Sequence, residues 1–330
     1  MQADNFNTPI LLISFNRPDH TWRVFEEIKK QKPTCLFVFQ DAPRRDRIED
    51  VDNCRAVRKI FSESIDWDCE LKTFYAQDNL GCGRGPSSAI TWFFQNVEQG
   101  IIFEDDCLPH PDFFNYCEIL LEDYRENKKI SLIGGANFQD GIKRGDGSYY
   151  FSAGHHGTWG WATWKDRWSQ FDYLISNIET SAFKVTIKRY FKNRIQKRYW
   201  LDIYFQVKKD QFLNSCWDYQ FTFSYWKNNQ LAIIPNQNLI CNIGFDIQAT
   251  HTNSNSSKFA DKPTNSILPL IKPSYIYQDV KADFYLHKNY VQSYDYGLRG
   301  LLRMHHRLNK LIKRMLNHNG SWIKKNIYDK

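Results

Sequence analysis

Three consecutive acidic residues, Glu104-Asp105-Asp106, are the part of this sequence best suited to chemistry. They follow the apolar run Ile101-Ile102-Phe103, where a buried strand is predicted to reach the surface. Carboxylates this close raise one another's pKa unless a cation neutralises them, and Mg²⁺ or Mn²⁺ binds such oxygens together with phosphates. Because side chains alternate along a strand, Glu104 and Asp106 are predicted to face one way and Asp105 the other. A solvated acidic loop is the alternative interpretation.

Other polar residues also follow predicted strands. Arg17 comes after the first strand, and Asp41 comes after the second. Asp41 could accept a hydrogen bond from a base or ribose, or form a local turn before Ala42-Pro43. The Gly-rich stretch 81–85 precedes a predicted helix and could approach a diphosphate, with Arg84 as the counter-charge. It lacks the lysine and the spacing of known phosphate-binding loops.

The second half of the chain contributes three more candidates. Asp218, between Trp217 and Tyr219, could take a proton from an acceptor hydroxyl, or could simply begin a helix. His251 could bind a metal or lie on the surface. Trp161 could stack on a sugar ring or pack in the core.

Alternating strands and helices must position these side chains. The predicted strands are 9–15, 35–40, 71–75, 100–103 and 130–133, and the predicted helices are 18–30, 44–61, 86–97 and 112–127. This order predicts an α/β fold with a mainly parallel, Rossmann-like sheet flanked by helices. In such sheets ligands bind at the carboxyl ends of the strands, where Arg17, Asp41 and the acidic triplet are expected. Residues 181–200 form a strongly basic helical segment.

Composition narrows the class of protein. Of the 330 residues 42% are hydrophobic, which argues against global disorder. No apolar run has the length of a membrane span, and residues 1–10 lack the features of a signal peptide. The eight cysteines contain no CxxC pair, so we expect reduced thiols and a cytoplasmic protein. The net charge is +7, but no nucleic-acid-binding motif accompanies it, so we expect no nucleic-acid partner.

The ordered motifs resemble those of GT-A glycosyltransferases, most closely N-acetylglucosaminyltransferase I and its protein O-mannose relatives. The resemblance runs from about residue 8 to about residue 251. It is carried by these segments: Asn16-Arg17, Phe39-Gln40-Asp41, Gly100-Ile101-Ile102-Phe103-Glu104-Asp105-Asp106, Pro111-Asp112-Phe113-Phe114, Trp159-Gly160-Trp161 and Trp217-Asp218. The acidic segment and the Pro-Asp-Phe-Phe after it are the most specific part.

The resemblance implies a role for each matched residue. Asp41 would bind uracil and Arg17 would lie near the nucleotide, while Glu104 and Asp105 would contact ribose and donor sugar. Asp106 would bind Mn²⁺ or Mg²⁺, His251 would be a further metal ligand, and Asp218 would be the general base. The sequence departs from the relatives in lacking an N-terminal anchor, in its basic segment, and in having Tyr219 where they have a second acid.

The implied function is metal-dependent, inverting transfer of a hexosyl or N-acetylhexosaminyl group such as GlcNAc from a UDP-sugar. The acceptor would be a hydroxyl of a glycan or a lipid-linked oligosaccharide, in synthesis of a bacterial-type surface polysaccharide. One alternative is a sugar-nucleotide pyrophosphorylase, although Asn16-Arg17-Pro18 does not resemble the Gly-rich loop of that class. Another is a degenerate transferase that only binds glycans or membranes.

The chain is predicted to divide at about residue 290. Residues 1–290 would form the GT-A domain, with a nucleotide-sugar half at 8–135 and an acceptor half at 136–290. Residues 291–330 would form a basic amphipathic helical tail, because apolar residues recur at helical spacing between 297 and 317 among arginines and lysines. Such a helix would place the protein on the inner face of an anionic membrane, or would dock on the protein itself.

Overall fold

The structure is a computed structural model that describes residues 6–155, 158–209, 216–245 and 258–291. The first half contains β1 (Ile10–Ser14), α1 (Pro18–Gln31), β2 (Cys35–Gln40), α2 (Glu49–Glu63), β3 (Glu70–Tyr75), α3 (Gly81–Asn96), β4 (Gln99–Glu104), β5 (Cys107–Pro109), α4 (Asp112–Asp123) and β6 (Ile130–Gly134). The second half contains β7 (Tyr149–Ser152), β8 (Trp161–Trp164), α5 (Lys165–Trp168), α6 (Thr180–Tyr190), α7 (Arg194–Lys208), α8 (Asp218–Lys227), β9 (Leu231–Pro235), β10 (Ile240–Asn242), α9 (Val280–Leu286) and a π-helical turn (His287–Val291).

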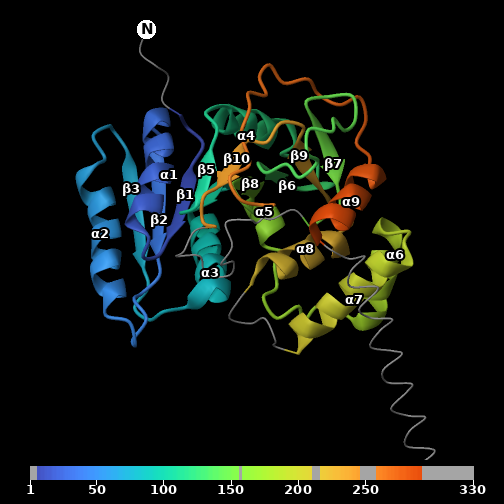
Figure 1. Cartoon of the computed structure of the whole chain (residues 1–330), viewed down its shortest axis with the longest axis horizontal. Helices are drawn as coiled ribbons and strands as arrows, with labels where there is room; N and C mark the ends of the chain where they lie inside the picture. Colours follow the sequence, from blue (N-terminus) through green and yellow to red (C-terminus); the bar gives the residue numbers. More distant parts are fainter. Residues whose placement is uncertain (1–5, 156–157, 210–215, 246–257, 292–330) are drawn as a thin grey trace, which may run out of the picture.

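Eight strands form one sheet in the order β3-β2-β1-β4-β8-β6-β9-β7 (Figure 1). Strands β3, β2, β1 and β4 run parallel, as do β6 and β9, whereas β8 is antiparallel to both of its neighbours and β7 to β9. The short strands β5 and β10 pair beside this sheet. The predicted α/β class with a mainly parallel sheet flanked by helices is therefore confirmed.

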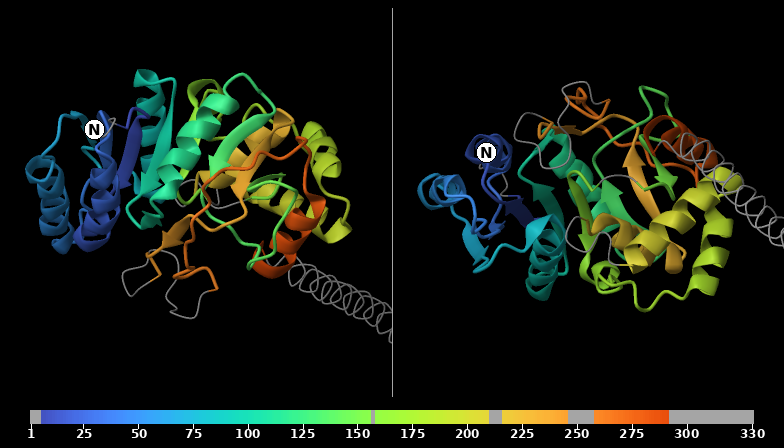
Figure 2. Two further views of the ribbon diagram at one scale, coloured as in Figure 1. Left: turned by 90° about the horizontal axis from the view of Figure 1, so that it is seen from above. Right: turned by 60° about the horizontal axis from the view of Figure 1, so that its bottom comes forward.

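Alternation of apolar side chains along the strands explains the layers. In β1, Ile10 and Leu12 pack into the core that contains α1, α2 and α4, whereas Leu11 and Ile13 pack into the core that contains α3 and α5 to α8. Both faces are therefore buried, as a parallel sheet with crossover helices requires. Figure 2 shows helices on both sides of the sheet.

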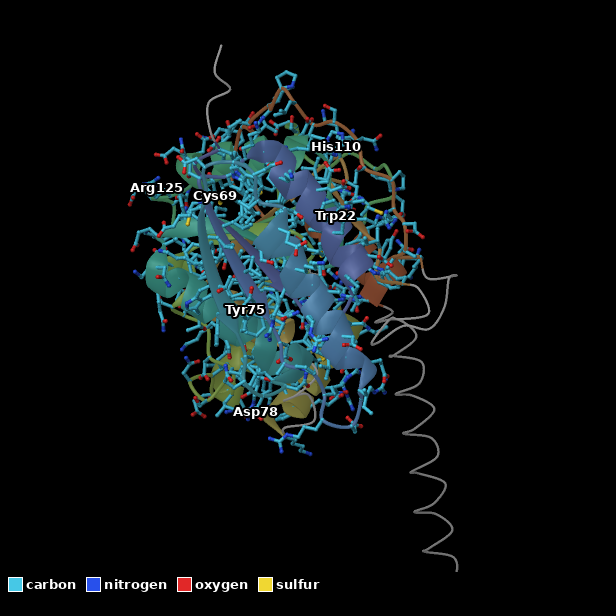
Figure 3. The ribbon with its side chains drawn as sticks, turned by 90° about the vertical axis from the view of Figure 1, so that its left-hand side faces the viewer. Trp22, Cys69, Tyr75, Asp78, His110 and Arg125 are labelled. Carbon is cyan, nitrogen blue, oxygen red and sulfur yellow. The ribbon has the colours of Figure 1, made fainter. Side chains whose placement is uncertain are left out.

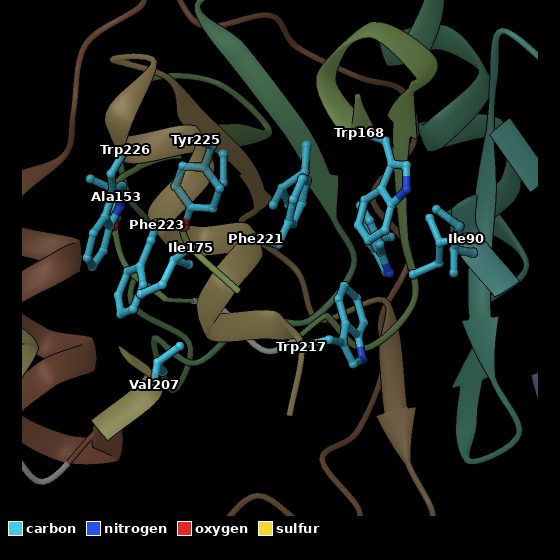
Figure 4. Packing of buried hydrophobic residues seen from close by; sticks show 14 of the residues in the cluster. Ile90, Ala153, Trp168, Ile175, Val207, Trp217, Phe221, Phe223, Tyr225 and Trp226 are labelled. Atoms are coloured by element: carbon cyan, nitrogen blue, oxygen red, sulfur yellow. The ribbon is translucent and has the colours of Figure 1, made fainter. Parts of the chain in front are cut away.

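Aromatic residues fill the core on the α3 side. Trp168 lies with its ring centroid 6.0 Å from that of Trp217 and 5.3 Å from that of Phe221 (Figure 4). Trp217 and Phe221 flank the start of α8, so this packing fixes the position of the helix that carries Asp218.

The opposite side of the molecule is built on α1, α2 and the edge strand β3 (Figure 3). Tyr75 ends β3, and the guanidinium of Arg58 on α2 lies 4.5 Å from its ring centroid. Beyond this strand, Asp78 pairs with Arg45 at 2.8 Å in an exposed ion pair. These contacts lie at the carboxyl end of β3, near the connections that follow β2 and β3.

Several predicted boundaries differ from the structure. Helix α3 begins at Gly81, not at residue 86, so the Gly-rich stretch is the start of the helix and not a loop before it. The basic segment 181–200 forms two helices, α6 and the first part of α7, whose apolar side chains face the core while Lys184, Lys188 and Arg189 are exposed.

The predicted division at about residue 290 stays a prediction. Strands from both predicted halves join the one large sheet, and the tail at 292–330 lies outside the described residues. Within the ranges that the structure describes, no helix has both the length and the hydropathy of a membrane span.

Candidate active site

Arg17 links the ends of two central strands. β1 and β4 lie side by side, with Ile13 opposite Glu104, so the residues that follow both strands meet at one edge of the sheet. The Arg17 guanidinium contacts a carboxylate oxygen of Asp105 and lies 3.0 Å from Oδ2 of Asp106. The backbone amide of Phe15 also donates to Asp105. The structure thus places one cation between two of the predicted carboxylates.

Contacts with Asp50 hold the turn that carries Arg17. Asn16 donates a hydrogen bond of 2.6 Å to Asp50 of α2, and Arg44 pairs with the same buried carboxylate. The side-chain hydrogen bond from Arg44 lowers the pKa of Asp50, although burial opposes it. Asp50 is therefore a charged anchor for the three-residue connection between β1 and α1.

The acidic triplet does not keep the strict alternation expected of a strand. β4 ends at Glu104, and Asp105 and Asp106 form a turn, so both of their carboxylates reach Arg17. Asp105 is only 3% exposed, and burial raises its pKa while the Arg17 charge lowers it. Burial would lower the pKa of Arg17, but the two aspartates raise it, so the guanidinium stays protonated.

The electrostatic surroundings of Glu104 differ from those of Asp105. Burial, followed by the charges of Asp106 and Asp105, raises the pKa of Glu104 to about 8, and Asp218 adds to the shift while Arg17 opposes it. Among the described residues none donates a hydrogen bond to the Glu104 carboxyl group. At neutral pH this group is therefore mostly protonated, and it could donate a hydrogen bond to a sugar or ribose hydroxyl.

Asp106 lies against a glycine that is required there. The backbone amide of Ile243 donates to the carbonyl oxygen of Asp106 at 2.9 Å, which brings the segment after β10 beside the acidic turn. A Cβ atom on Gly244 would lie 2.3 Å from Oδ2 of Asp106 and 2.9 Å from its Cβ. Only a residue without a side chain leaves the Asp106 carboxylate in this position.

A hard divalent cation beside Asp106 would find few protein ligands among the described residues. The Asp106 carboxylate supplies oxygen ligands, and the bare backbone of Gly244 leaves this carboxylate room. Within the described ranges no three His, Cys, Asp or Glu side chains come together as a metal cage. A cation here would need further oxygens from a diphosphate and water, which is how Mg²⁺ is often held. His251, the other predicted ligand, lies outside the described residues.

Asp218 begins α8 and has a partner that the sequence analysis missed. Nε2 of His155 lies 3.3 Å from Oδ2 of Asp218, and the backbone amide of Tyr219 donates to Oδ1 at 3.0 Å. Burial raises the pKa of Asp218, but the hydrogen bond and charge of His155 outweigh it, so the pKa is below its usual value. The carboxyl group is therefore ionised at neutral pH, as a general base must be.

Electrostatic coupling shows that these groups share one neighbourhood. The charge of Asp218 raises the pKa of Glu104, and the charges of Glu104, Asp41 and Asp218 all raise that of Cys82 in the first turn of α3. The structure thus brings together the end of β4 and the first turns of α3 and α8. Asp218 is the one charged residue of this group that the second half of the chain supplies.

Both carboxylate oxygens of Asp41 accept hydrogen bonds from the protein itself. Oδ1 accepts hydrogen bonds from the backbone amides of Ala42 and Leu80, both at 2.8 Å, and Oδ2 accepts from Gly81 at 2.9 Å and from the Asn79 side chain at 3.3 Å. A carboxylate offers about four acceptor positions, so a uracil ring would have to displace one of these donors. Asp41 fixes the start of α3 in this structure, and its contact with a base stays a prediction.

Arg84 lies in the first turns of α3 and is exposed. Its side chain lowers the pKa of Tyr173, which burial raises, so the two groups are near one another. Asp41 ties residues 80 and 81 into the beginning of α3, so the Gly-rich stretch is the start of a helix and its approach to a diphosphate stays a prediction. Arg84 remains accessible as a counter-charge.

Trp161 does not offer a face to a sugar. Its side chain is 1% exposed, and its ring is stacked on Trp217 with centroids 5.8 Å apart. Phe221 contacts it from α8 at 5.2 Å. The prediction that Trp161 stacks on the donor is therefore wrong, since β8 is an inner strand of the sheet and both of its faces are covered.

His155, Thr222 and Gly244 were missed for different reasons. His155 lies in the stretch 149–163, which is rich in Gly, His and Trp, but no spacing connects position 155 to position 218. Thr222 is one turn along α8 from Asp218, at the i, i+4 spacing that places two side chains on one face. Nothing in the sequence around Gly244 indicates that it faces Asp106.

Comparison with known proteins identifies no family for this chain. No protein-family model matches this chain, and no curated protein sequence matches it. Among solved structures, apo UDP-glucose pyrophosphorylase aligns with TM-score 0.35 and 9% identity over 69% of this chain and 90% of that chain. A 4-diphosphocytidyl-2C-methyl-D-erythritol synthase from Anaerococcus prevotii aligns with TM-score 0.31 and 10% identity over 59% and 84% of the two chains. HddC from Yersinia pseudotuberculosis aligns with TM-score 0.30 and 9% identity over 48% and 77%.

These three proteins include a pyrophosphorylase and a synthase, as their names state. TM-scores this low carry no argument about activity. The residues at the carboxyl edge of the sheet, and not these similarities, are therefore the basis for inferring a function.

Proposed function

We propose that this protein is an enzyme that transfers a sugar from a nucleoside diphosphate sugar to a hydroxyl group, with inversion at the anomeric carbon. One observation carries the proposal: an ionised carboxylate, Asp218, shares its neighbourhood with Glu104, beside the Arg17-bound acidic turn. A single base facing a charge-neutralising site is what an inverting transfer needs.

The negative charge of the acidic turn favours the binding of a divalent cation there. Among the residues that the structure describes, Asp105 and Asp106 outnumber the one guanidinium that contacts them, so their summed charge is negative even when Glu104 is protonated. A diphosphate would be repelled from such a turn unless a cation came with it. Mn²⁺ or Mg²⁺ held by Asp106 would supply charge neutralisation for the departing diphosphate. The choice of metal, and His251 as a second ligand, are part of this proposal.

The chain's own residues then have distinct tasks. Arg17 holds the two aspartates in place, and the Glu104 carboxyl group contacts a hydroxyl of the donor. Asp218 removes the proton of the acceptor hydroxyl as that oxygen attacks the anomeric carbon. The bond between this carbon and the diphosphate oxygen breaks, and its electron pair leaves with the nucleoside diphosphate. The proton ends on the Asp218 carboxylate.

The finer assignments rest on the resemblance to N-acetylglucosaminyltransferase I. They are UDP as the nucleotide, GlcNAc or a similar hexose as the sugar, and a glycan or lipid-linked oligosaccharide as the acceptor. Surface polysaccharide synthesis at the inner face of a membrane would suit such an acceptor. The exposed Lys184, Lys188 and Arg189 of α6 add positive charge that an anionic surface would attract.

A transfer assay with radiolabelled UDP-sugars and mixed glycan acceptors tests the proposal. Asp218→Asn should lower kcat by about 10²- to 10⁴-fold, the usual value of a general base, with nucleotide affinity unchanged. Asp66→Asn is a matched control, because that aspartate is exposed and pairs with Lys29 far along the chain from the site. Unchanged turnover in Asp218→Asn would refute the base assignment.

The same assay separates the two alternatives. A pyrophosphorylase would form a nucleotide sugar from a sugar phosphate and a nucleoside triphosphate, with release of pyrophosphate. The connection between β1 and α1, Phe15-Asn16-Arg17, has no glycine and so does not resemble the Gly-rich loop of that class. A degenerate binding protein would bind glycan or nucleotide without any turnover.

A further inference from the structure

His155 makes polar contacts through both of its ring nitrogens. Nε2 lies 3.3 Å from Oδ2 of Asp218, and Nδ1 lies 2.8 Å from Oγ1 of Thr222. Asp218 and Thr222 are both on α8, whereas His155 follows β7. The imidazole therefore spans one turn of α8 and connects the predicted base to a hydroxyl on the same helix.

The chemistry of the three groups determines which of them donates and which accepts each hydrogen bond. A carboxylate only accepts, so Nε2 carries the hydrogen that is shared with Asp218. Thr222 can accept from a protonated Nδ1 or donate to a bare one, so the pair holds the ring in one orientation in either state. Since both ring nitrogens are occupied, His155 has no nitrogen left for a substrate, whereas the Asp218 side chain is 28% exposed.

Aromatic packing fixes the ring from its sides. The imidazole is stacked on Tyr219 with centroids 4.7 Å apart, and the ring centroid of Trp200 lies 5.8 Å from that of the imidazole, with the two ring planes at 69°. Trp200 is fully buried and donates from its indole nitrogen to His287 at 2.9 Å. A side chain held in this way cannot rotate freely, so the Asp218 carboxylate that it contacts is also restrained.

We propose that His155, held by Thr222, is a positioning residue that orients the Asp218 carboxylate toward the acceptor hydroxyl. The proposal rests on the proposed function, because it assigns His155 a task in the transfer reaction. It also extends that function by naming two residues that would not touch donor or acceptor.

Several titratable groups face Asp218 and enter any pH dependence. His155 comes from the segment after β7, Glu104 from β4, Cys82 from α3, and Tyr199 from α7, in addition to the chain neighbours of Asp218. Only His155 donates to the carboxylate from outside α8 among these described groups. Removing it should therefore make Asp218 easier to protonate, and the acid limb of the pH profile should move to higher pH.

The experiment uses two matched pairs of variants in the full-length protein. His155→Phe keeps a flat ring for Tyr219 but removes both nitrogens, whereas His155→Gln keeps an amide donor. Thr222→Val removes the hydroxyl at equal size, whereas Thr222→Ser keeps it. We expect kcat to fall about 10- to 100-fold in His155→Phe and less in Thr222→Val, with partial recovery in the Gln and Ser partners and an unchanged KM for the donor.

The pH profile of kcat/KM is the readout that a merely structural role would not move. The acid limb should shift upward by about one pH unit in His155→Phe. A wild-type profile and kcat in both His155→Phe and Thr222→Val would overturn the proposal. So would equal losses in Thr222→Val and Thr222→Ser, since these variants differ in the hydroxyl. If His155→Phe does not fold, the Thr222 pair decides.

Failure of the proposed function is distinguishable from failure of this inference. If the wild-type protein transfers no sugar, the proposed function fails. Carbon-13 NMR titration of the Asp218 carboxyl group then still decides whether His155 controls its protonation. An unchanged titration midpoint in His155→Phe would overturn the pairing itself.

Discussion

Replacing Arg17 by methionine should destabilise the protein in a pH-dependent way. Arg17 is the cation that contacts both Asp105 and Asp106, and its side chain is only 16% exposed. Methionine has a similar length but no charge, so it leaves Asp105, itself 3% exposed, as a buried and unpaired carboxylate. Breaking a buried ion pair from one side costs about 3–5 kcal/mol.

The expected change in melting temperature follows from the size of the chain. With an unfolding entropy of about 2.1 cal/mol/K per residue, a loss of about 3 kcal/mol corresponds to about 4 °C. Without Arg17, the buried carboxyl groups bind protons more tightly in the folded state than in the unfolded chain. The free energy of unfolding of the variant should therefore recover as the pH falls from 8 toward 5.

Differential scanning calorimetry at several pH values measures this effect, with Arg45→Met as the matched control. Arg45 pairs with Asp78 at the same kind of distance, 2.8 Å, but both side chains are largely exposed, so that pair contributes less than about 1 kcal/mol. Equal melting temperatures for the two variants at pH 8, or a loss in Arg17→Met that does not recover at pH 5, would refute the reasoning about the acidic turn.

Three further predictions concern single side chains. Gly244→Ala should weaken Mn²⁺-dependent nucleotide binding about tenfold or more in calorimetric titration, because its Cβ displaces Asp106. Asp283 is 2% exposed and burial raises its pKa to about 6, so the free energy of unfolding should fall by about 3 kcal/mol as the pH rises from 4 past 6. Asp283→Asn should abolish that slope in denaturant titrations; an unchanged slope would show that another group causes it. Trp161→Ala should cost about 3–5 kcal/mol in denaturant titrations without changing nucleotide affinity, and the reverse pattern would restore its role in sugar binding.

Local sequence patterns were sufficient to predict the strands and helices of the first half of the chain. Runs such as Ile10–Ser14 and Cys35–Gln40 are apolar at every buried position except the last, where Ser14 and Gln40 stand, so their strands and the parallel order followed from hydrophobicity and connection length. The same reasoning placed Arg17 and the acidic triplet at one edge of the sheet. The ion pair between Arg17 and both aspartates required the three-dimensional turn, because the end of β4 decides where alternation stops.

Features that depend on distant contacts could not be predicted in this way. In the sequence, Asp41 looks like a free carboxylate. In the structure, the backbone amides of residues 80 and 81 donate hydrogen bonds to it. Trp161 looks like a stacking surface until α8 covers it. His155 and Asp218 are separated by 63 positions, and only the packing of α8 against the segment after β7 brings them together.

Nucleotide binding tests the central claim most directly. The melting temperature should be measured with UDP, GDP, CMP and dTDP, each with and without Mn²⁺, in the wild-type protein and in Asp106→Ala. A ligand at about a hundred times its Kd adds about 2.7 kcal/mol, which is about 4 °C for a chain of this size. We expect stabilisation by UDP that needs Mn²⁺ and is lost in Asp106→Ala. Absence of stabilisation by any of these nucleotides would contradict the proposed donor site.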